Sequence, residues 1–337
     1  MKTLKRLGVF VVFAIIAQQG ILIYINNFML GSRSVFKAKV PTIQDEMKIL
    51  IPENINEFQS SFDGKYCSYY SKDTLYIIDI ETSMRKKIEF KDGQTLNLYR
   101  WYNDSNKMIL AEQSTANGAA KLKLTIYDAD LGLQEDFKDL SWLGHDIVID
   151  AVDFGEADDL VVKVVNGEGR ADLFYVGEEI SKLSATTRNI GTMTYLIKEK
   201  SVIYQDKTSK KYYITGNKNP IDLISPTSTI IDVDSLGNLY LFDVDMEGKK
   251  QIYYKQLDTE DDWIALEVEE DIDAEDIYID EEGNIYTNNV LEGKITELKS
   301  KAVFTYSGKF MDFFKGGVFT AKDNELRKIE FNKEENK

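Results

Sequence analysis

A hairpin signature that the chain repeats limits the possible folds more than any other feature. The segments "IIDVDSLGNLYLF" at 230–242 and "IYIDEEGNIYTNN" at 277–289 share the frame Asp-x-x-Gly-Asn-apolar-Tyr, and their first aspartates, Asp234 and Asp280, are 46 residues apart. An aspartate can accept hydrogen bonds from the N–H groups of a turn, glycine adopts positive φ without steric cost, and asparagine tolerates the same region. Each segment therefore predicts a tight hairpin, with the tyrosine on the returning strand.

The same arrangement recurs in degenerate form along most of the chain. Five further copies are "SSFDGKYCSYY", "WYNDSNKMILA", "DFGEADDLVVKV", "LIKEKSVIYQD" and "FFKGGVFTA". The strands before the seven turns are expected to start near 58, 96, 147, 192, 228, 275 and 309, at intervals of 34 to 51 residues. Short runs rich in Tyr, Ile, Val, Phe and Leu lie between the turns, and no long segment has the helical period. Repeats of this length with about four strands each are typical of propeller blades, which must close into a ring to bury both faces of each sheet. The prediction is an all-β propeller of seven four-stranded blades, with six or eight also compatible.

The two sharp copies resemble the β-propeller families, in particular those with NHL-like and tryptophan-aspartate-like blades. The resemblance rests on residues 234–240 and 280–286 and extends in weaker form over about 55–331. The Trp-Asp dipeptide of the second family is missing. The resemblance implies a propeller that binds proteins or glycans or acts as a scaffold, because a fold of this kind does not itself define a reaction.

The amino terminus carries the signal of a membrane segment. Lys2, Lys5 and Arg6 precede a run from Leu7 to Ile25 without a charge, 19 residues long, against roughly 20 for a helix that crosses the bilayer core. The prediction is one uncleaved signal-anchor helix with the rest of the chain outside the cytoplasm. A secretory signal cleaved after Ala17, which would release the protein, and a cytoplasmic helix are the alternatives.

The expected organisation follows from these segments. Residues 1–30 form a cytoplasmic tip and the transmembrane helix, 31–57 a stalk, 58–331 the propeller and 332–337 a polar tail. The stalk contains one strand-like run, "EMKILI" at 46–51. We expect this strand to pair beside the last repeat, at 309–331, because propellers often close by letting one terminus complete the blade made by the other.

Composition excludes several functions. A formal net charge of −16 argues against nucleic acid as a partner, since such proteins gain affinity from cations that neutralise phosphates. Cys67 is the only cysteine and His145 the only histidine, so disulfides, cysteine-rich metal sites and histidine-based triads are not expected. We predict no enzymatic activity and no cofactor, although two carboxylates, as in glycosidases, remain possible among 57 acidic residues.

Two acidic segments are candidate sites. Asp243, Asp245 and Glu247 faintly resemble a calcium loop but lack its closing glutamate. The stretch 258–282 has 14 acidic residues and no Lys or Arg, and a basic partner would relieve its self-repulsion. Its candidate contact residues for a partner are Asp258, Asp261, Asp262 and Trp263, with Trp263 as the anchor; the alternative is that Trp263 packs between blades and the acids face solvent.

The predicted function is a membrane-anchored, extracytoplasmic propeller that binds or scaffolds a protein or glycan of the cell envelope. The alternatives are an envelope-polysaccharide enzyme or its accessory subunit, and a ligand sensor that acts through a membrane partner.

Overall fold

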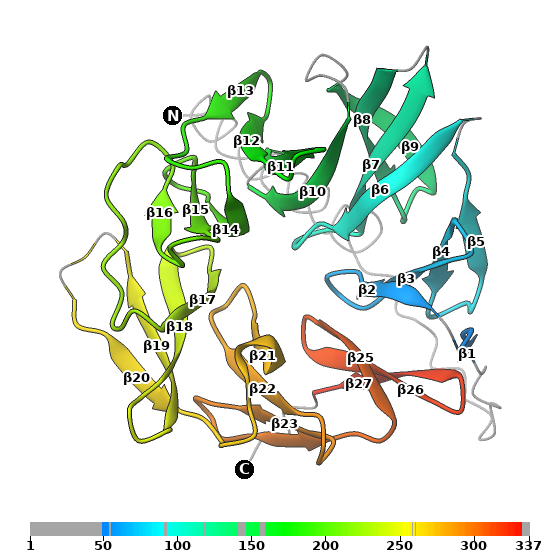
Figure 1. Cartoon of the computed structure of the whole chain (residues 1–337). Helices are drawn as coiled ribbons and strands as arrows, with labels where there is room; N and C mark the ends of the chain where they lie inside the picture. Colours follow the sequence, from blue (N-terminus) through cyan, green and yellow to red (C-terminus); the bar gives the residue numbers. More distant parts are fainter. Residues whose placement is uncertain are drawn as a thin grey trace, which may run out of the picture. The chain divides into compact units, whose positions relative to one another are not determined.

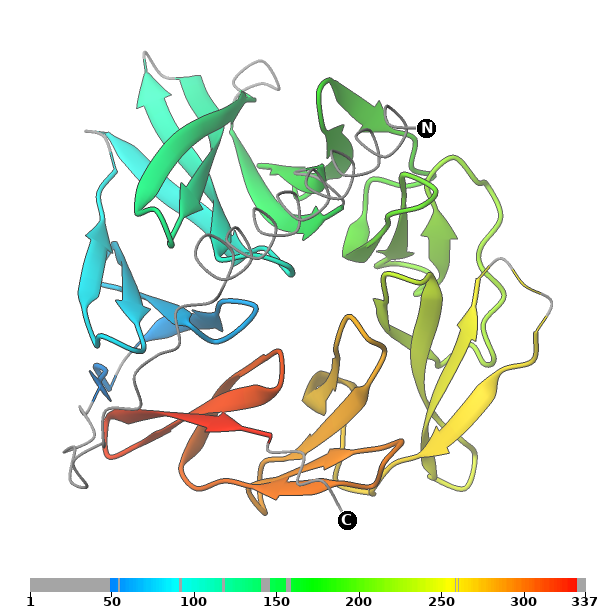
Figure 2. The ribbon, with the colours of Figure 1, turned by 180° about the vertical axis from the view of Figure 1, so that it is seen from behind.

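The computed structural model describes residues 49–53, 55–90, 93–116, 119–140, 146–155, 159–257, 259 and 261–331. These residues form seven antiparallel sheets arranged as the blades of a closed ring (Figures 1 and 2). The fold is a seven-bladed β-propeller, so the predicted fold class and blade number are confirmed. No helix of the described part is long and apolar enough to cross a membrane, and the predicted anchor at 7–25 lies outside that part.

We number the blades in chain order, each from its innermost strand outwards. Blade 1 contains β2 (Asn56–Ser60), β3 (Tyr66–Ser71), β4 (Thr74–Asp79) and β5 (Arg85–Ile88). Blade 2 contains β6 (Gln94–Trp101), β7 (Lys107–Ala116), β8 (Ala119–Asp128) and β9 (Leu133–Asp139). Blade 3 contains β10 (Ile147–Phe154), β11 (Leu160–Asn166), β12 (Ala171–Val176) and β13 (Ile180–Leu183). Blade 4 contains β14 (Ile190–Leu196), β15 (Ser201–Asp206) and β16 (Tyr212–Ile214).

The remaining three blades complete the ring. Blade 5 contains β17 (Thr229–Val233), β18 (Asn238–Val244), β19 (Lys250–Gln256) and β20 (Ile264–Glu267). A short 3-10 helix, η3 (Ala274–Asp276), leads into blade 6, which contains β21 (Ile277–Ile279), β22 (Ile285–Asn289), β23 (Lys294–Glu297) and β24 (Val303–Thr305). Blade 7 contains β25 (Lys309–Phe314), β26 (Gly317–Lys322) and β27 (Glu325–Glu330), with β1 (Ile49–Leu50) as its outer strand.

The inner strands begin where the turn repeats predict. They start at residues 56, 94, 147, 190, 229, 277 and 309, so no predicted start is wrong by more than two residues. Blade 4 departs from the four-strand expectation, because its sheet has three strands and only a single bridge between Tyr213 and Pro220 in place of the fourth. Beside that bridge the N–H of Ile221 donates to the carbonyl of Tyr212 at 2.8 Å.

The amino-terminal strand closes the ring as predicted. Ile49 pairs with Leu326 and Leu50 with Glu325, so β1 adds an antiparallel edge to β27. Ile51 follows in the same direction, and its N–H donates to the carbonyl of Asn324 at 2.8 Å. Of the predicted strand 46–51, residues 46–48 lie outside the described residues.

The Asp-x-x-Gly-Asn turns form as predicted, with one correction. Asp234 Oδ1 accepts from the N–H groups of Leu236 at 3.0 Å and Asn238 at 2.9 Å, and Gly237 adopts φ +83°. The asparagine, however, does not take positive φ. Instead the side-chain amide of Asn238 donates to Asp234 Oδ2 at 2.8 Å. Asn therefore belongs to this motif as a hydrogen-bond donor that fixes the aspartate.

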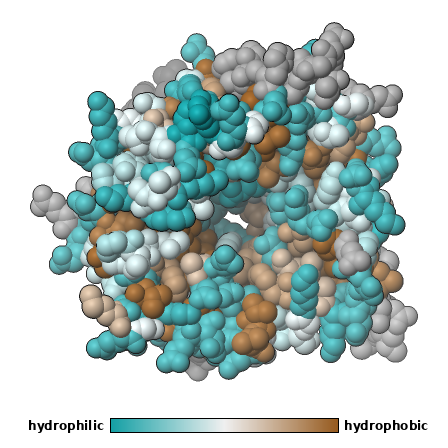
Figure 3. Space-filling view, viewed as in Figure 1, coloured by the Kyte–Doolittle hydropathy of each residue, from teal (hydrophilic) through white to brown (hydrophobic). Residues whose placement is uncertain are grey.

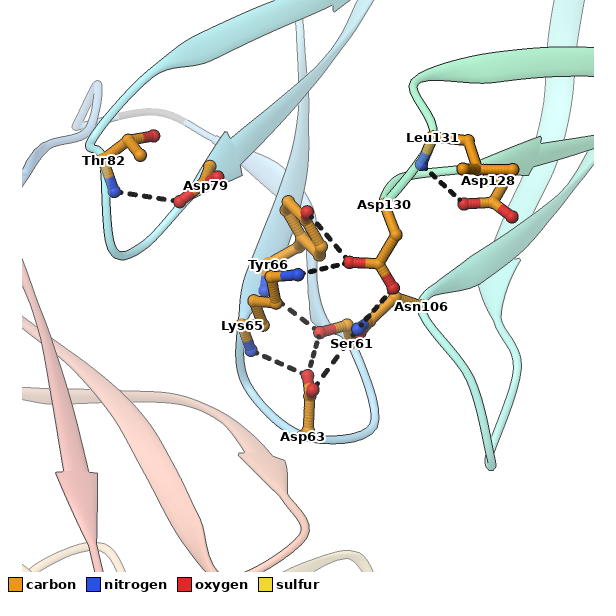
Figure 4. Close-up of polar contacts among 10 residues, drawn as sticks. All are labelled: Ser61, Asp63, Lys65, Tyr66, Asp79, Thr82, Asn106, Asp128, Asp130 and Leu131. Atoms are coloured by element: carbon orange, nitrogen blue, oxygen red, sulfur yellow. Dashed lines mark hydrogen bonds and ion pairs between the residues drawn. The ribbon is translucent and has the colours of Figure 1, made fainter. Parts of the chain in front are cut away.

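The degenerate turn of blade 1 extends this chemistry to the next blade (Figure 4). Asp63 accepts from the main-chain N–H of Lys65 at 2.9 Å and from the side-chain amide of Asn106, in blade 2, at 3.3 Å. Asp130, also in blade 2, accepts from the Tyr66 hydroxyl at 3.1 Å and pairs with the Lys65 ammonium. The hydrogen bond from Lys65 lowers the pKa of Asp130. Polar turns thus join neighbouring blades as well as neighbouring strands.

Apolar side chains fill the space between the blades. The largest of these clusters packs blade 2 against blade 3, with Ile109, Leu124, Val152 and Val162 all buried in it. Cys67 is fully buried in the cluster beneath the closing strand, which agrees with its interpretation as a small apolar residue, and burial raises the pKa of its thiol.

Candidate functional site: the mouth of the central channel

A channel runs through the centre of the ring, and the space-filling view shows its narrow opening (Figure 3). A cavity of about 690 Å³ occupies this channel at the end where the inner strands turn into the second strands. Its lining comes from all seven blades. Because each blade gives the channel one inner strand, the ring gathers residues here that are far apart in the sequence.

One position of each inner strand contributes to a ring of seven side chains in this cavity. It is the second-last residue of the inner strand in five blades and the third-last in blades 4 and 7. In blade order, the ring consists of Gln59, Arg100, Asp153, Thr194, Asp232, Tyr278 and Asp312. Three carboxylates and one guanidinium therefore line the same cavity.

Several members of this ring bind the next blade. Gln59 Nε2 donates to the carbonyl of Tyr99 in blade 2 at 3.0 Å. Asp153 Oδ2 accepts from the main-chain N–H of Tyr195 in blade 4 at 2.7 Å, and Asp312 makes the equivalent contact between blades 7 and 1.

Arg100 and Tyr278 make their own contacts to the following blade. Arg100 donates to the carbonyl of Val152 in blade 3. The ring of Tyr278 stacks on Phe313 in blade 7, with centroids 4.6 Å apart. The side chains of the channel ring therefore serve mainly to connect the inner strands of neighbouring blades.

Asp232 departs from this pattern. Its Oδ1 accepts from the N–H of the adjacent Val233 at 2.8 Å, and among the described residues no hydrogen-bond donor of blade 6 reaches it. The main chain of the next blade thus holds Asp153 and Asp312 but leaves the second oxygen of Asp232 facing the cavity. A donor group brought by a ligand would satisfy that oxygen.

The pKa values of Asp232 and Asp312 are raised towards neutral pH. Burial and the neighbouring charge of Asp153 raise the pKa of Asp232 to about 7, against the opposing effects of the Val233 N–H and of Arg100. Burial raises the pKa of Asp312 to about 6, although its hydrogen bonds from Ser60 act in the opposite direction. Near neutral pH, Asp232 is therefore a carboxylate that a cationic group would stabilise in its charged form.

The rim of the cavity has aromatic and acidic side chains. Phe62, Tyr102 and Asp104 come from blades 1 and 2, and Ser235 and Glu281 from blades 5 and 6. Burial raises the pKa of Glu281. Over the whole lining, seven acidic residues face two basic ones, Arg100 and Lys315. This composition suits a ligand with a positive charge and an apolar or hydroxyl-bearing body.

The calcium-loop candidates are not brought together as a metal site. Asp243 is buried and accepts from the hydroxyl groups of Ser225 at 2.8 Å and Thr227 at 3.0 Å. Asp245 accepts from the N–H groups of Glu247 at 2.9 Å and Lys249 at 2.8 Å, so it serves its own hairpin turn. No group of three acidic, cysteine or histidine side chains in the described part of the chain could hold a metal ion.

The candidate contact residues at the start of the acidic segment lie outside the channel, whereas Asp280 and Glu281 near its end line the cavity. Asp261 and Asp262 are exposed just before β20, whereas Asp258 is outside the described residues. Trp263 is partly buried against the apolar cluster shared by blades 4 and 5, with the ammonium of Lys255 5.0 Å from its ring centroid. None of these side chains lines the channel cavity. His145 also lies outside the described residues.

The sequence analysis did not identify the channel ring. A signal was present, since an aspartate between apolar residues directly precedes three of the seven turns, in "VDF" at 152–154, "IDV" at 231–233 and "MDF" at 311–313. Strand alternation alone would not show that these aspartates meet. Only closure of the ring brings them together.

Comparisons with known proteins support the fold but identify no family. No family model and no curated protein matches the chain. A solved prolyl endopeptidase is 12% identical over 82% of this chain and 45% of its own, with a TM-score of 0.50. Dipeptidyl peptidase 4 of Porphyromonas gingivalis is 11% identical over 74% of this chain and 44% of its own, with a TM-score of 0.46. The WD40 domain of SCAP from fission yeast is 11% identical over 82% of this chain and 81% of its own, with a TM-score of 0.41.

The seven sheets of the described residues define the class of protein, a seven-bladed β-propeller. This chain spans less than half the length of the two peptidases. The identities are too low to transfer a reaction or a partner.

Proposed function

We propose that the chain is a non-enzymatic binding module of the cell envelope, anchored to the membrane by residues 7–25 with the propeller outside the cytoplasm. In this proposal a partner binds at the channel mouth, and a basic side chain of that partner reaches Asp232. The partner is an envelope protein, with an envelope glycan as the alternative.

The carboxylate of Asp232 carries this proposal. It lies in a cavity lined by all seven blades, its counterparts Asp153 and Asp312 are held by the next blade, and its own second oxygen is not. A carboxylate in such surroundings gains most from a cationic partner, because the low-dielectric walls strengthen the attraction. The excess of acids in the lining favours a lysine or arginine of a protein over a neutral sugar.

The first experiment identifies what binds the channel mouth. A photo-crosslinking amino acid replaces Ser235, which lines the cavity, and in a matched strain it replaces Thr82, which lies in the outer turn of blade 1 and outside the lining. We expect a specific adduct from position 235 and none from 82. Mass spectrometry then distinguishes a protein adduct from a glycan adduct.

The second experiment measures affinity for the purified partner. We expect Asp232→Asn in the full-length chain to weaken binding about tenfold, as one lost charge-assisted hydrogen bond would. Asp261→Asn and Asp262→Asn, which change charge equally outside the channel, serve as controls. Unchanged binding by Asp232→Asn would disprove the channel-mouth site, and a loss confined to the two controls would assign binding to the acidic segment of blade 5.

A further inference from the structure

A second cavity, of about 640 Å³, lies between blades 3 and 4. It opens beside the inner strands β10 and β14, which neighbour each other in the ring (Figure 1). Its lining is mainly cationic, whereas the lining of the channel mouth is mainly acidic. Four cationic side chains face a single carboxylate there, namely Arg100, Lys163, Lys207 and Lys210 against Asp150.

Two strand irregularities form the walls of this cavity. In β10 the ladder passes from Ile149 directly to Ala151, so Asp150 is an extra residue outside the regular pairing. In β14 the ladder shifts between Ile190 and Met193, which releases Gly191 and its neighbour. Similar register shifts occur in β2, β6, β17 and β25, so they belong to the inner strands of this fold in general. The two in β10 and β14 redirect side chains and backbone groups towards the same cavity.

Lys163 connects the two bulges. Its ammonium pairs with Asp150 Oδ2 at 2.6 Å and donates to the carbonyl of Gly191 at 2.7 Å. Lys163 is also the only buried lysine or arginine of the described chain. Since an ammonium has three donors, these two contacts leave one N–H for another acceptor.

The other cations converge on the cavity from different elements. Arg100 comes from β6 of blade 2, where its guanidinium lies 3.7 Å from Asp153. Lys207 and Lys210 flank the turn between β15 and β16 and are exposed. Asp150 pairs with Lys163 and Asp153 lies near Arg100, so the lining gives Lys207 and Lys210 no carboxylate partner. This concentration of positive charge occurs in a chain whose net charge is −16.

We propose that this cavity is a binding site for an oxyanion with two or more negative charges, such as a phosphate group. The lysine ammonium groups would act as point charges, and the guanidinium of Arg100 would offer paired donors to two oxygens of the same anion. Asp150 competes with the anion for Lys163, so it limits affinity. The proposal does not rest on the partner proposed at the channel mouth, although Arg100 lines both cavities.

Titration calorimetry of the full-length chain in detergent at low ionic strength tests this site. Inorganic phosphate and citrate are the probes, with sodium chloride at matched ionic strength as the blank. We expect a saturable signal with one or both anions. Phosphate binding would identify a phosphorylated ligand and citrate binding a polycarboxylate, and either supports an oxyanion site.

Two sets of variants identify the cavity. The pair Lys207→Gln and Lys210→Gln should weaken binding about tenfold, since each exposed contact to a charged group contributes modestly. The pair Lys211→Gln and Lys218→Gln changes the net charge equally in the same blade but outside the lining, and it should leave affinity within about twofold. Asp150→Asn should strengthen binding about fivefold by removing the competing charge.

Any one of three results would overturn the proposal. They are a wild-type chain that binds neither anion, an equal loss of affinity in the two lysine pairs, and weaker anion binding by a folded Asp150→Asn variant. If Asp150→Asn fails to fold, the comparison of the two exposed lysine pairs decides alone.

Discussion

Asp312 in blade 7 accepts a hydrogen bond from the main-chain N–H of Ser60 in blade 1, which lies 252 residues earlier in the chain, at 2.8 Å. The Ser60 hydroxyl lies 2.5 Å from the carbonyl oxygen of Phe313 and 3.2 Å from Asp312 Oδ2. The Asp312 Oδ1 accepts from Phe313 N–H at 2.9 Å. The carboxylate therefore joins the inner strands of the first and last blades, where the ring has no covalent connection. The ring is thus closed at two places, by the contact between Asp312 and Ser60 at the channel and by the outer strand β1.

The contact between Asp312 and Ser60 predicts a specific loss of stability. Asp312→Ala leaves the main-chain N–H of Ser60 without its acceptor, whereas the Ser60 hydroxyl keeps the carbonyl of Phe313, and the change should lower the free energy of unfolding by about 2 kcal/mol. Asp312→Asn keeps an oxygen acceptor in place and should cost less than half as much. Urea unfolding at pH 7.5, followed by tryptophan fluorescence, measures both. Equal losses in the two variants would mean that Ser60 does not depend on this acceptor.

The closing strand β1 and the residue after it predict different stability losses at the adjacent positions 50 and 51. Ile51 is buried against Cys67, Phe319 and Leu326, so Ile51→Ala should lower the free energy of unfolding by about 3 kcal/mol. Leu50 is 60% exposed, and Leu50→Ala should change it by less than about 0.5 kcal/mol. Thermal unfolding of both variants checks this. Similar effects at the two positions would contradict the closing role of this segment.

The two sharp turns differ in how much space surrounds their glycines. Gly237 and Gly283 both have positive φ, +83° and +73°, so alanine at either position costs about 1 kcal/mol of backbone strain. A Cβ on Gly237 would come no closer than 3.8 Å to Lys198, whereas one on Gly283 would lie 2.9 Å from the Tyr240 hydroxyl. Gly283→Ala should therefore cost about 3 kcal/mol in total. Measuring Gly283→Ala again in a Tyr240→Phe background tests the cause, since most of the difference should disappear once the hydroxyl is gone.

The raised pKa of Asp232 predicts how stability depends on pH. Its pKa is about 7 in the folded state and about 3.8 when unfolded, so the folded chain retains this proton over a range in which the unfolded chain has lost it. The stability that results is fully present below about pH 3.8 and is lost as pH rises through 7. Relative to wild type, Asp232→Asn should therefore gain about 2 kcal/mol in unfolding free energy between pH 5 and pH 8. Urea unfolding at both pH values measures the gain, and a difference that stays constant with pH would show that Asp232 does not titrate in this range.

The sequence determined the repeat and the closing strand, because those depend on local chemistry. Asp234 and Asp280 mark the sharpest hairpins by interactions within five residues, and "EMKILI" is a strand pattern without a partner of its own. Local hydrogen bonds and strand periodicity can be recognised in one short window. The three-stranded blade 4 was not predicted, since the single bridge that replaces its fourth strand depends on pairing within the sheet and not on a local sequence pattern.

Only the tertiary structure decided which polar residues meet. Arg100, Asp153, Asp232 and Asp312 come from four blades and share one cavity because the ring turns one face of every inner strand towards a common axis. The cationic cavity likewise depends on two bulges that face each other from β10 and β14. Such contacts link residues tens to hundreds of positions apart. They form only when the ring closes, and this closure costs chain entropy. A window of sequence fixes a turn, but the packing of seven blades sets the charge and shape of the space between them.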